Sequence, residues 1–350
     1  MQTDILIIGG GLAGLRLATL LQDAGRDYIL VEARENLGGR ILSETHLGTA
    51  FDLGPAWFWP GQPRMAALTS ELGLQSFEQY ASGDLLIEDI NSGVQRGRGG
   101  MSMQGSLRVA GGLGAIITQM AARIESSRIN LSTPITSLTK TKDGICAQTE
   151  DGQHFDAKQV ALALPPRLAA QIAFTPAFPE KTLESMNSIS TWMGGQAKAV
   201  AIYDTPFWRE AGLSGDVMSR IGPMVEIHDA SPADGSAAAL FGFIGFPPHM
   251  RRDEAALREQ IGAQLQRIFG PVAAEPAALL LKDWAQDPFT SAPLDLQPLL
   301  AHPIYGMPAT LAGLWDKRIL FAGTEVARQF GGYLEGALEA AENTFAEIMS

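Results

Sequence analysis

The hydrophobic pattern at the start of the chain predicts a strand, a helix and a second strand in succession. In the stretch 4–8, the four residues after Asp4 form an unbroken apolar run, which is typical of a parallel strand buried on both faces. A glycine-rich turn leads into a segment with five leucines between positions 12 and 21, which indicates a helix. Residues 28–31 form the second apolar run, and Glu32 ends it. This is the pattern of a β-α-β unit.

The rest of the chain alternates between predicted helices and groups of short strands. The pattern predicts helices at 63–74 and 111–126, a hairpin at 84–96, and strands at 129–131, 135–140, 145–150 and 159–164. A different region begins near residue 192, with strand-like stretches at 196–203, 224–228 and 237–246, a helix at 253–269 and a Pro-rich connector at 288–308. We therefore predict a discontinuous domain of residues 1–62, 110–190 and 290–350, with 63–109 and 191–289 as a second, substrate domain.

Composition narrows the class of protein. The 350 residues are 46% hydrophobic and 18% charged, which suits a soluble globular protein with a large core. The net charge of −12, without any basic run, argues against a nucleic-acid partner. The single cysteine, Cys146, excludes a disulfide framework within the chain, and the five histidines lack metal-ligand spacing. No apolar run approaches ~18 residues and no leader pattern is present, so we expect no membrane span and a cytoplasmic protein.

The turn after the first strand carries a dinucleotide-binding pattern. Gly9 to Gly14 read G-x-G-x-x-G between a strand and a helix, where glycines allow a backbone to approach a pyrophosphate. Glu32, at the end of the second strand, is placed to bind a ribose diol, which favours FAD or NAD over NADP. A mere glycine-rich turn with a surface glutamate is the weaker alternative. The predicted contacts in this segment are Gly9, Gly11, Leu12, Ala13, Gly14, Glu32, Ala33 and Arg34.

Two further segments add anion-binding features. Gly38, Gly39 and Arg40 place a glycine pair before a guanidinium, whose fork suits a pyrophosphate. Near the other end of the chain, an apolar strand at 318–322 leads into Gly323-Thr324-Glu325 and then into a glycine pair that opens a helix at Tyr333. The chain therefore folds its two ends around one ligand.

On these residues the chain resembles the flavin-containing amine oxidases, the monoamine oxidase and polyamine oxidase group. The resemblance covers four blocks, residues 9–40, 51–57, 198–208 and 318–337. It implies an α/β, glutathione-reductase-type (Rossmann-like) FAD-binding domain with an inserted α+β substrate domain. Because no cysteine lies shortly before Gly323-Thr324-Glu325, where the covalent members of the family tether the flavin, the resemblance also implies noncovalent FAD. The cofactor contacts that it adds are Gly54, Pro55, Ala56, Trp57, Ile135, Trp284, Gly323, Glu325, Gly332, Tyr333, Leu334 and Ala337.

The resemblance assigns Lys198 to the catalytic centre, where it holds a water at flavin N5. Lys198 also interrupts an apolar strand, and a buried lysine without a function is uncommon, although a lysine reaching solvent is the alternative. Tyr333 resembles one wall of an aromatic cage around the amine, and a core tyrosine is its alternative. The second cage tyrosine is not evident. Trp57, Phe58, Trp59 and Phe289 are the candidates to replace it in the substrate pocket.

The resemblance implies an FAD-dependent oxidase of a small-molecule amine. Hydride would pass from the amine α-carbon to flavin N5, the imine would be hydrolysed, and dioxygen would reoxidise the flavin with release of hydrogen peroxide. The short segment between residues 59 and 111 leaves either an open site or one completed by a second copy in a homodimer. The alternatives are a dehydrogenase of the desaturase or protoporphyrinogen-oxidase kind, a renalase-like oxidase of a reduced nicotinamide, and a non-catalytic FAD-binding protein.

Overall fold

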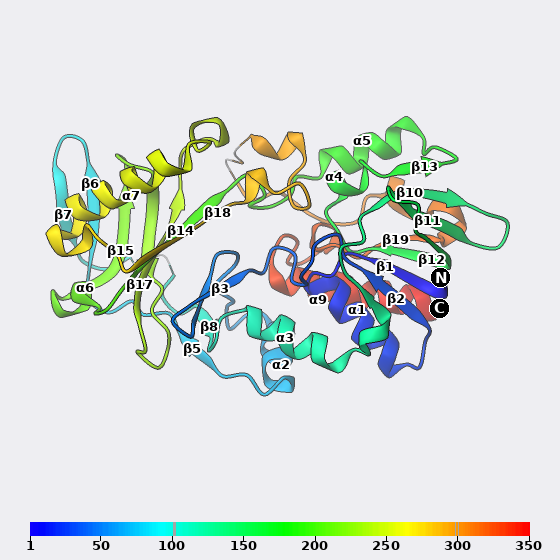
Figure 1. Ribbon diagram of the computed structural model, residues 1–350, viewed down its shortest axis with the longest axis horizontal. Coiled ribbons are helices and arrows are strands. Elements are labelled where there is room, and N and C mark those ends of the chain that lie inside the picture. Colours follow the sequence, from blue (N-terminus) through cyan, green and yellow to red (C-terminus); the bar gives the residue numbers. More distant parts are fainter. Residues whose placement is uncertain (101–102, 298, 300) are drawn as a thin grey trace.

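Two large β-sheets organise the chain and lie at opposite ends of an elongated molecule (Figure 1). The computed structural model describes residues 1–100, 103–297, 299 and 301–350. The first sheet has the order β13-β10-β11-β12-β1-β2-β9, and β19 also pairs with β12. Its strands are β1 (Gln2–Ile8), β2 (Tyr28–Val31), β9 (Ile129–Asn130), β10 (Ile135–Lys140), β11 (Ile145–Thr149), β12 (His154–Leu162), β13 (Ala173–Thr175) and β19 (Ile319–Phe321).

Strand β1 lies inside the first sheet and pairs in parallel with β2 and β12. Its side chains alternate between two cores, because successive residues of a strand point to opposite faces. Ile5 and Ile7 enter the core beneath the helices α1, α2, α3 and α9, whereas Leu6 and Ile8 enter the core on the other face. These helices are α1 (Leu12–Asp23), α2 (Pro63–Glu71), α3 (Gly114–Arg123) and α9 (Leu334–Met349).

The second sheet is mostly antiparallel and has the order β18-β14-β17-β16-β15-β6-β7. Helix α7 covers one face, and the segment from Phe51 to Trp57 packs on the other. The strands are β6 (Asp84–Asp89), β7 (Gly93–Gly97), β14 (Ala197–Tyr203), β15 (Leu213–Ser219), β16 (Met224–Asp229), β17 (Ala238–Ile244) and β18 (Ala278–Asp283). The other helices are α4 (Pro166–Ala169), α5 (Glu180–Ser188), α6 (Phe207–Glu210), α7 (Glu254–Phe269) and α8 (Leu314–Lys317).

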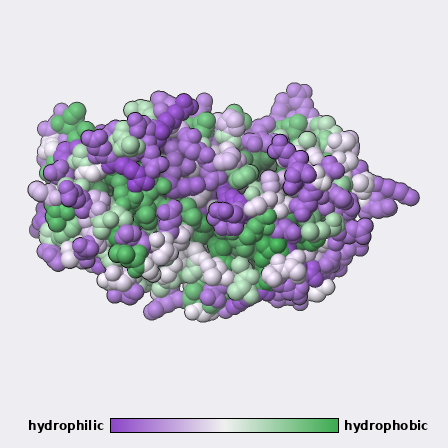
Figure 2. All heavy atoms as spheres, viewed as in Figure 1, coloured by the Kyte–Doolittle hydropathy of each residue, from purple (hydrophilic) through white to green (hydrophobic). Residues whose placement is uncertain are grey.

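Two small hairpins join these units. Strands β3 (Ser43–His46) and β4 (Thr49–Asp52) form one, and β5 (Ser76–Glu78) pairs with β8 (Leu107–Val109). On the face shown in Figure 2, groups of hydrophobic residues lie between hydrophilic ones. None of the helices in the described ranges is both long and apolar enough to cross a membrane. The same ranges contain no cluster of acidic, histidine and cysteine side chains fit for a metal ion.

The structure confirms the predicted β-α-β unit and the predicted α/β class. Several strands were not predicted, among them β15, β18 and the two strands of the hairpin β3 and β4. The segment 63–109, which we assigned to the substrate domain, is divided in the structure. Helix α2 packs against α9, whereas β6 and β7 join the second sheet. The exact domain boundaries therefore stay a prediction.

Candidate active site

A cavity of about 990 Å³ lies where the two ends of the chain meet the second sheet. Its walls come from the turn after β1, the end of β2, segments 38–41 and 53–57, and the start of α9. Strands β14, β16 and β17 supply the wall on the side of the second sheet. The structure thus brings residues more than 300 positions apart in the sequence to one site.

The glycine turn shapes one end of the cavity. Gly9 has a φ of +112°, and a Cβ there would lie 2.6 Å from the Ala163 carbonyl oxygen. At Gly14 a Cβ would lie 1.9 Å from the Gly9 carbonyl oxygen, so this glycine permits close packing of α1 on β1 and does not line the cavity. At Gly11 a Cβ would meet no protein atom closer than 3.7 Å. The space beside Gly11 is therefore available to a ligand such as a pyrophosphate.

Glu32 presents a fixed carboxylate to the same end of the cavity. Its side chain is buried, and its oxygens accept hydrogen bonds from the backbone N–H groups of Gly10 at 2.7 Å and Arg34 at 2.9 Å. A carboxylate has about four acceptor positions, so two backbone bonds leave capacity for a ribose diol. The geometry suits the diol contact that we predicted for Glu32.

Arg34 lines the cavity but also holds another segment in place. Its Nη2 donates to Asp287 Oδ1 at 2.6 Å and to Thr290 Oγ1 at 2.8 Å, and its guanidinium lies 5.5 Å from the Phe289 ring centre. Because these contacts occupy one edge of the guanidinium, Arg34 ties the end of β2 to the segment from Asp287 to Thr290. The backbone N–H of Arg34 donates to the Glu32 carboxylate, which keeps this part of the backbone at the cavity.

Glu325 lies behind the cavity wall and contacts Arg40, which does line it. Arg40 Nη1 lies 2.7 Å from Glu325 Oε1, so the two charges balance. The Glu325 side chain is 0% exposed, and the Arg40 guanidinium compensates the burial of its charge. The room at Gly11 and the Glu32 carboxylate fit a ligand with phosphate and hydroxyl groups, as FAD has.

Lys198 is buried in the cavity wall formed by the second sheet. Residues 197, 199 and 201 of β14 face the core under α7, so Lys198 shares the opposite face with Val200 and Ile202. Its Nζ donates to the Gly54 carbonyl oxygen at 2.7 Å and lies 4.2 Å from the Phe241 ring centre. Burial lowers the pKa of Lys198 to about 7, although Asp52 opposes this shift. The structure thus excludes the solvent-reaching alternative for this lysine.

Aromatic rings gather around Tyr333, the residue that precedes α9. The Tyr333 ring stacks on His302 with centres 4.9 Å apart, and it meets Trp59 edge-on at 6.2 Å. Trp192 packs edge-on against His302 at 4.6 Å. Tyr333, Trp59 and Trp192 line the cavity, so this cluster forms an aromatic wall near the positive end of α9.

The structure brings most of the predicted site residues to the cavity. Three of them do not line it: Phe58 is a core residue at 1% exposure, Gly14 packs against β1, and Glu325 lies behind Arg40. Sequence reasoning missed Trp192, Glu226, Phe243 and Arg251, because only the pairing of distant strands and loops places them here. The predicted residues that line the cavity are Gly9, Gly11, Leu12, Ala13, Glu32, Ala33, Arg34, Gly38, Gly39, Arg40, Gly54, Pro55, Ala56, Trp57, Ile135, Lys198, Trp284, Phe289, Gly323, Gly332, Tyr333, Leu334 and Ala337.

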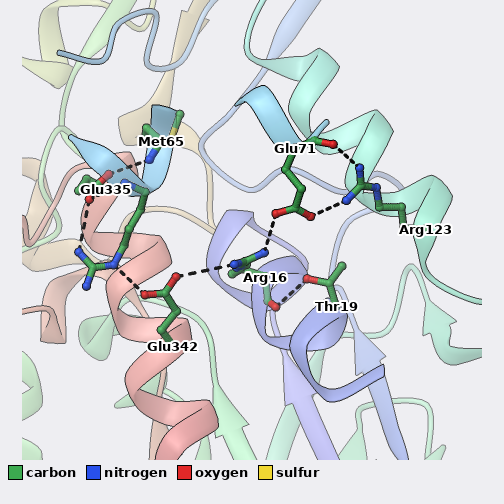
Figure 3. A network of polar contacts seen from close by, with 8 residues as sticks. Arg16, Thr19, Met65, Glu71, Arg123, Glu335 and Glu342 are labelled. Carbon is green, nitrogen blue, oxygen red and sulfur yellow. Dashed lines mark hydrogen bonds and ion pairs between the residues drawn. The ribbon is translucent and has the colours of Figure 1, made fainter. Parts of the chain in front are cut away.

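Glu335 connects the start of α9 to the start of α2 (Figure 3). Its carboxylate accepts hydrogen bonds from the backbone N–H groups of Arg64 at 3.0 Å and Met65 at 2.8 Å, which lie in the first turn of α2. The Arg64 guanidinium also contacts Glu342 at 2.8 Å. Trp59 lies just before α2 and Tyr333 just before α9. Because Glu335 connects the starts of these two helices, it helps to fix the positions of both rings.

The Rossmann-like domain, with Gly11 and Glu32 at its cavity, defines the class as a dinucleotide-binding protein. The chain matches the family described as "Flavin containing amine oxidoreductase" over residues 12–99 and 94–349. The chain belongs to this flavin-containing amine oxidoreductase family. Its cofactor is therefore a flavin, in agreement with the FAD that the sequence predicts.

Individual relatives agree with this assignment. The chain is 24% identical to "Probable flavin-containing monoamine oxidase A" of Dictyostelium discoideum, with 99% of this chain and 97% of the relative covered. It is 23% identical to "Amine oxidase [flavin-containing] B" of Homo sapiens, with 99% and 86% covered. A structure of wild-type putrescine oxidase bound to putrescine matches with a TM-score of 0.82 at 20% identity, covering 100% of this chain and 99% of that one. Cyclohexylamine oxidase from Brevibacterium oxydans IH-35A matches with a TM-score of 0.80 at 20% identity, covering 99% and 98%.

Proposed function

We propose that this member of the family is an oxidase of a small amine, with noncovalently bound FAD and dioxygen as electron acceptor. Bound FAD would accept a hydride from the amine α-carbon and pass the electrons to dioxygen, which would leave as hydrogen peroxide. The observation that supports this proposal most is the presence of Lys198 and Tyr333 on one cavity with the glycine turn. The similarity to putrescine oxidase and cyclohexylamine oxidase supports a small amine.

Different residues of the chain would bind the cofactor and the substrate. Gly11, Glu32 and Arg40 would hold the pyrophosphate and ribose of FAD. The start of α9 would direct its positive end at the flavin ring and stabilise negative charge there. Because the only cysteine of the chain is Cys146 on β11, outside the cavity, noncovalent binding is the simplest arrangement.

Tyr333 and Lys198 would act on the substrate side. The Tyr333 ring would position the amine nitrogen by contact with its electron-rich face. Lys198 would hold a water next to the reacting centre and, as an ammonium, favour electron transfer to dioxygen. Replacing Lys198 with methionine should then slow reoxidation of the reduced enzyme by oxygen. An unchanged reoxidation rate would refute this role.

The experiment that tests the proposal is a panel of aliphatic, aromatic and polyamine substrates assayed for hydrogen peroxide and aldehyde. Release of both in equal amounts supports the oxidase. Amine-dependent reduction of an artificial electron acceptor without peroxide would indicate a dehydrogenase instead, and oxidation of a reduced nicotinamide alone would favour the renalase-like alternative. A cytoplasmic location and a homodimer remain predictions, to be tested by cell fractionation and light scattering.

A further inference from the structure

Arg251 places a buried guanidinium in the wall of the cavity, on the side of the second sheet. The residue follows a short 3-10 turn, Pro248–Met250, between β17 and α7. Its side chain is only 1% exposed, yet it lines the cavity together with Gly195 and Phe246. Arginine is rarely buried to this degree unless its N–H groups are paired.

The pairing of Arg251 is incomplete. Its Nη2 donates one hydrogen bond to the Gly195 carbonyl oxygen at 2.7 Å, and the same nitrogen lies 3.1 Å from Asp283 Oδ1. Its Nε is buried and has no hydrogen-bond partner among the residues that the structure describes, and the same holds for Asp283 Oδ2. A guanidinium has five N–H donors in a planar fork. The protein therefore leaves much of this donor set to a ligand.

The charge of Arg251 is paired with the Asp283 carboxylate, and both groups are buried. Burial lowers the pKa of Arg251, and Asp283 opposes that shift. Burial in turn raises the pKa of Asp283, against the effect of Arg251. A ligand carboxylate could accept a charge-assisted hydrogen bond from an N–H group of Arg251 that Gly195 and Asp283 leave free.

We propose that Arg251 binds a carboxylate of the amine substrate, so that the preferred substrate is an amino acid whose amine and carboxylate are separated by several carbons. This inference rests on the proposed amine oxidation. Gly195, whose oxygen contacts Arg251, lies three residues before Lys198, so their Cα atoms are at most about 10 Å apart. Arg251, Lys198 and Tyr333 line the same cavity, so an amine near Lys198 and a carboxylate at Arg251 would belong to one linear molecule.

A second charged group makes the proposal open to refutation. Glu226 also lines the cavity and contacts His228 Nε2 at 2.8 Å. If Glu226 rather than Arg251 selected the far end of the substrate, a diamine would be preferred over an amino acid. The two charges thus predict opposite preferences for compounds of equal length.

The test compares three series with the flavin-loaded enzyme: ω-amino acids from 4-aminobutanoate to 6-aminohexanoate, and the alkylamines and terminal diamines of equal carbon number. We expect kcat/KM for at least one amino acid to exceed that of its alkylamine by on the order of 10- to 100-fold, as for hydrogen bonds to charged groups. R251M should bring this ratio close to one, and R251K should give an intermediate ratio because lysine lacks the fork. R252M is the matched control, since Arg252 is exposed, and should keep the wild-type ratio.

Wild-type measurements decide the question even if R251M does not retain flavin. Hexanoate should inhibit oxidation of hexylamine competitively, whereas hexanol should inhibit far more weakly. Oxidation of alkylamines with no gain for any amino acid, or a preference for the diamines, would overturn the carboxylate site and leave the amine oxidase intact. Failure of every compound in these series to be oxidised would overturn the carboxylate site, and failure of the aromatic amines and polyamines as well would overturn the proposed function itself.

Discussion

Replacing Lys198 with methionine should remove a pH dependence of stability that this buried amine imposes. Burial lowers the pKa of Lys198 from 10.5 to about 7 in the folded chain. Between these values the unfolded chain binds more protons than the folded chain, so the free energy of unfolding rises with pH across that window. Below pH 7 both states carry the proton, and the contribution of Lys198 no longer changes.

The size of the effect follows from the same pKa values. A shift from 10.5 to about 7 corresponds to roughly 5 kcal/mol over the whole window, at 1.36 kcal/mol per unit. Between pH 7 and pH 9 the wild-type protein should gain about 2 kcal/mol relative to K198M, because at pH 7 the folded lysine is already half deprotonated. Titrating groups that do not interact with Lys198 affect both proteins equally, so the difference between them reports Lys198 together with its coupling to Asp52 and Arg108.

Urea denaturation of the flavin-free protein at pH 7, 8 and 9 measures this difference. The control is K181M, which replaces an exposed lysine on α5 and should follow the wild type at each pH. Parallel pH profiles for the wild type and K198M would show that Lys198 is not a desolvated amine. They would also remove the physical basis for its proposed role beside the flavin.

Three more substitutions test other parts of the site. E335Q should lower the free energy of unfolding, measured in urea, by about 1–2 kcal/mol, because the backbone N–H groups at the start of α2 lose a charged acceptor. The control E342Q changes a side chain that is 36% exposed and should alter this free energy by less than about 1 kcal/mol. Equal losses in the two variants would contradict the capping role of Glu335. G11V should fold, because Gly11 has a φ of −77° that valine can adopt. The valine side chain would enter the cavity, so the purified variant should carry little FAD. Normal flavin content, measured by absorbance, would argue against a pyrophosphate site at Gly11. Y333F should keep most of the wild-type kcat/KM for amines while Y333L loses roughly tenfold, and equal values for Y333L and the wild type would exclude a role for the ring.

The parts of the fold that depend on local patterns were predictable from the sequence. The β-α-β unit follows from an apolar run, a glycine turn and a helical leucine pattern, all within the first 32 residues. The second sheet does not follow from such patterns, because β6 pairs in parallel with β15 across more than 120 residues of sequence. Its register depends on the packing of the whole chain.

The same distinction applies to the site. Gly11 and Glu32 belong to a motif with fixed spacing, so their place at the cavity could be predicted. Phe58 alternates with Trp57 along an extended segment, and only the structure shows that its side chain enters the core instead of the cavity. Arg251 has no motif around it, and Glu335 lies in the block at 318–337 but had no predicted role. The roles of both appear only when their distant partners are located.

The most direct test of the central claim is the absorbance of the purified flavoprotein during anaerobic addition of amines. We expect the visible flavin band to bleach with at least one amine and to return when air is admitted, with release of hydrogen peroxide. A flavin that dithionite reduces but that no amine in the panel bleaches would contradict it.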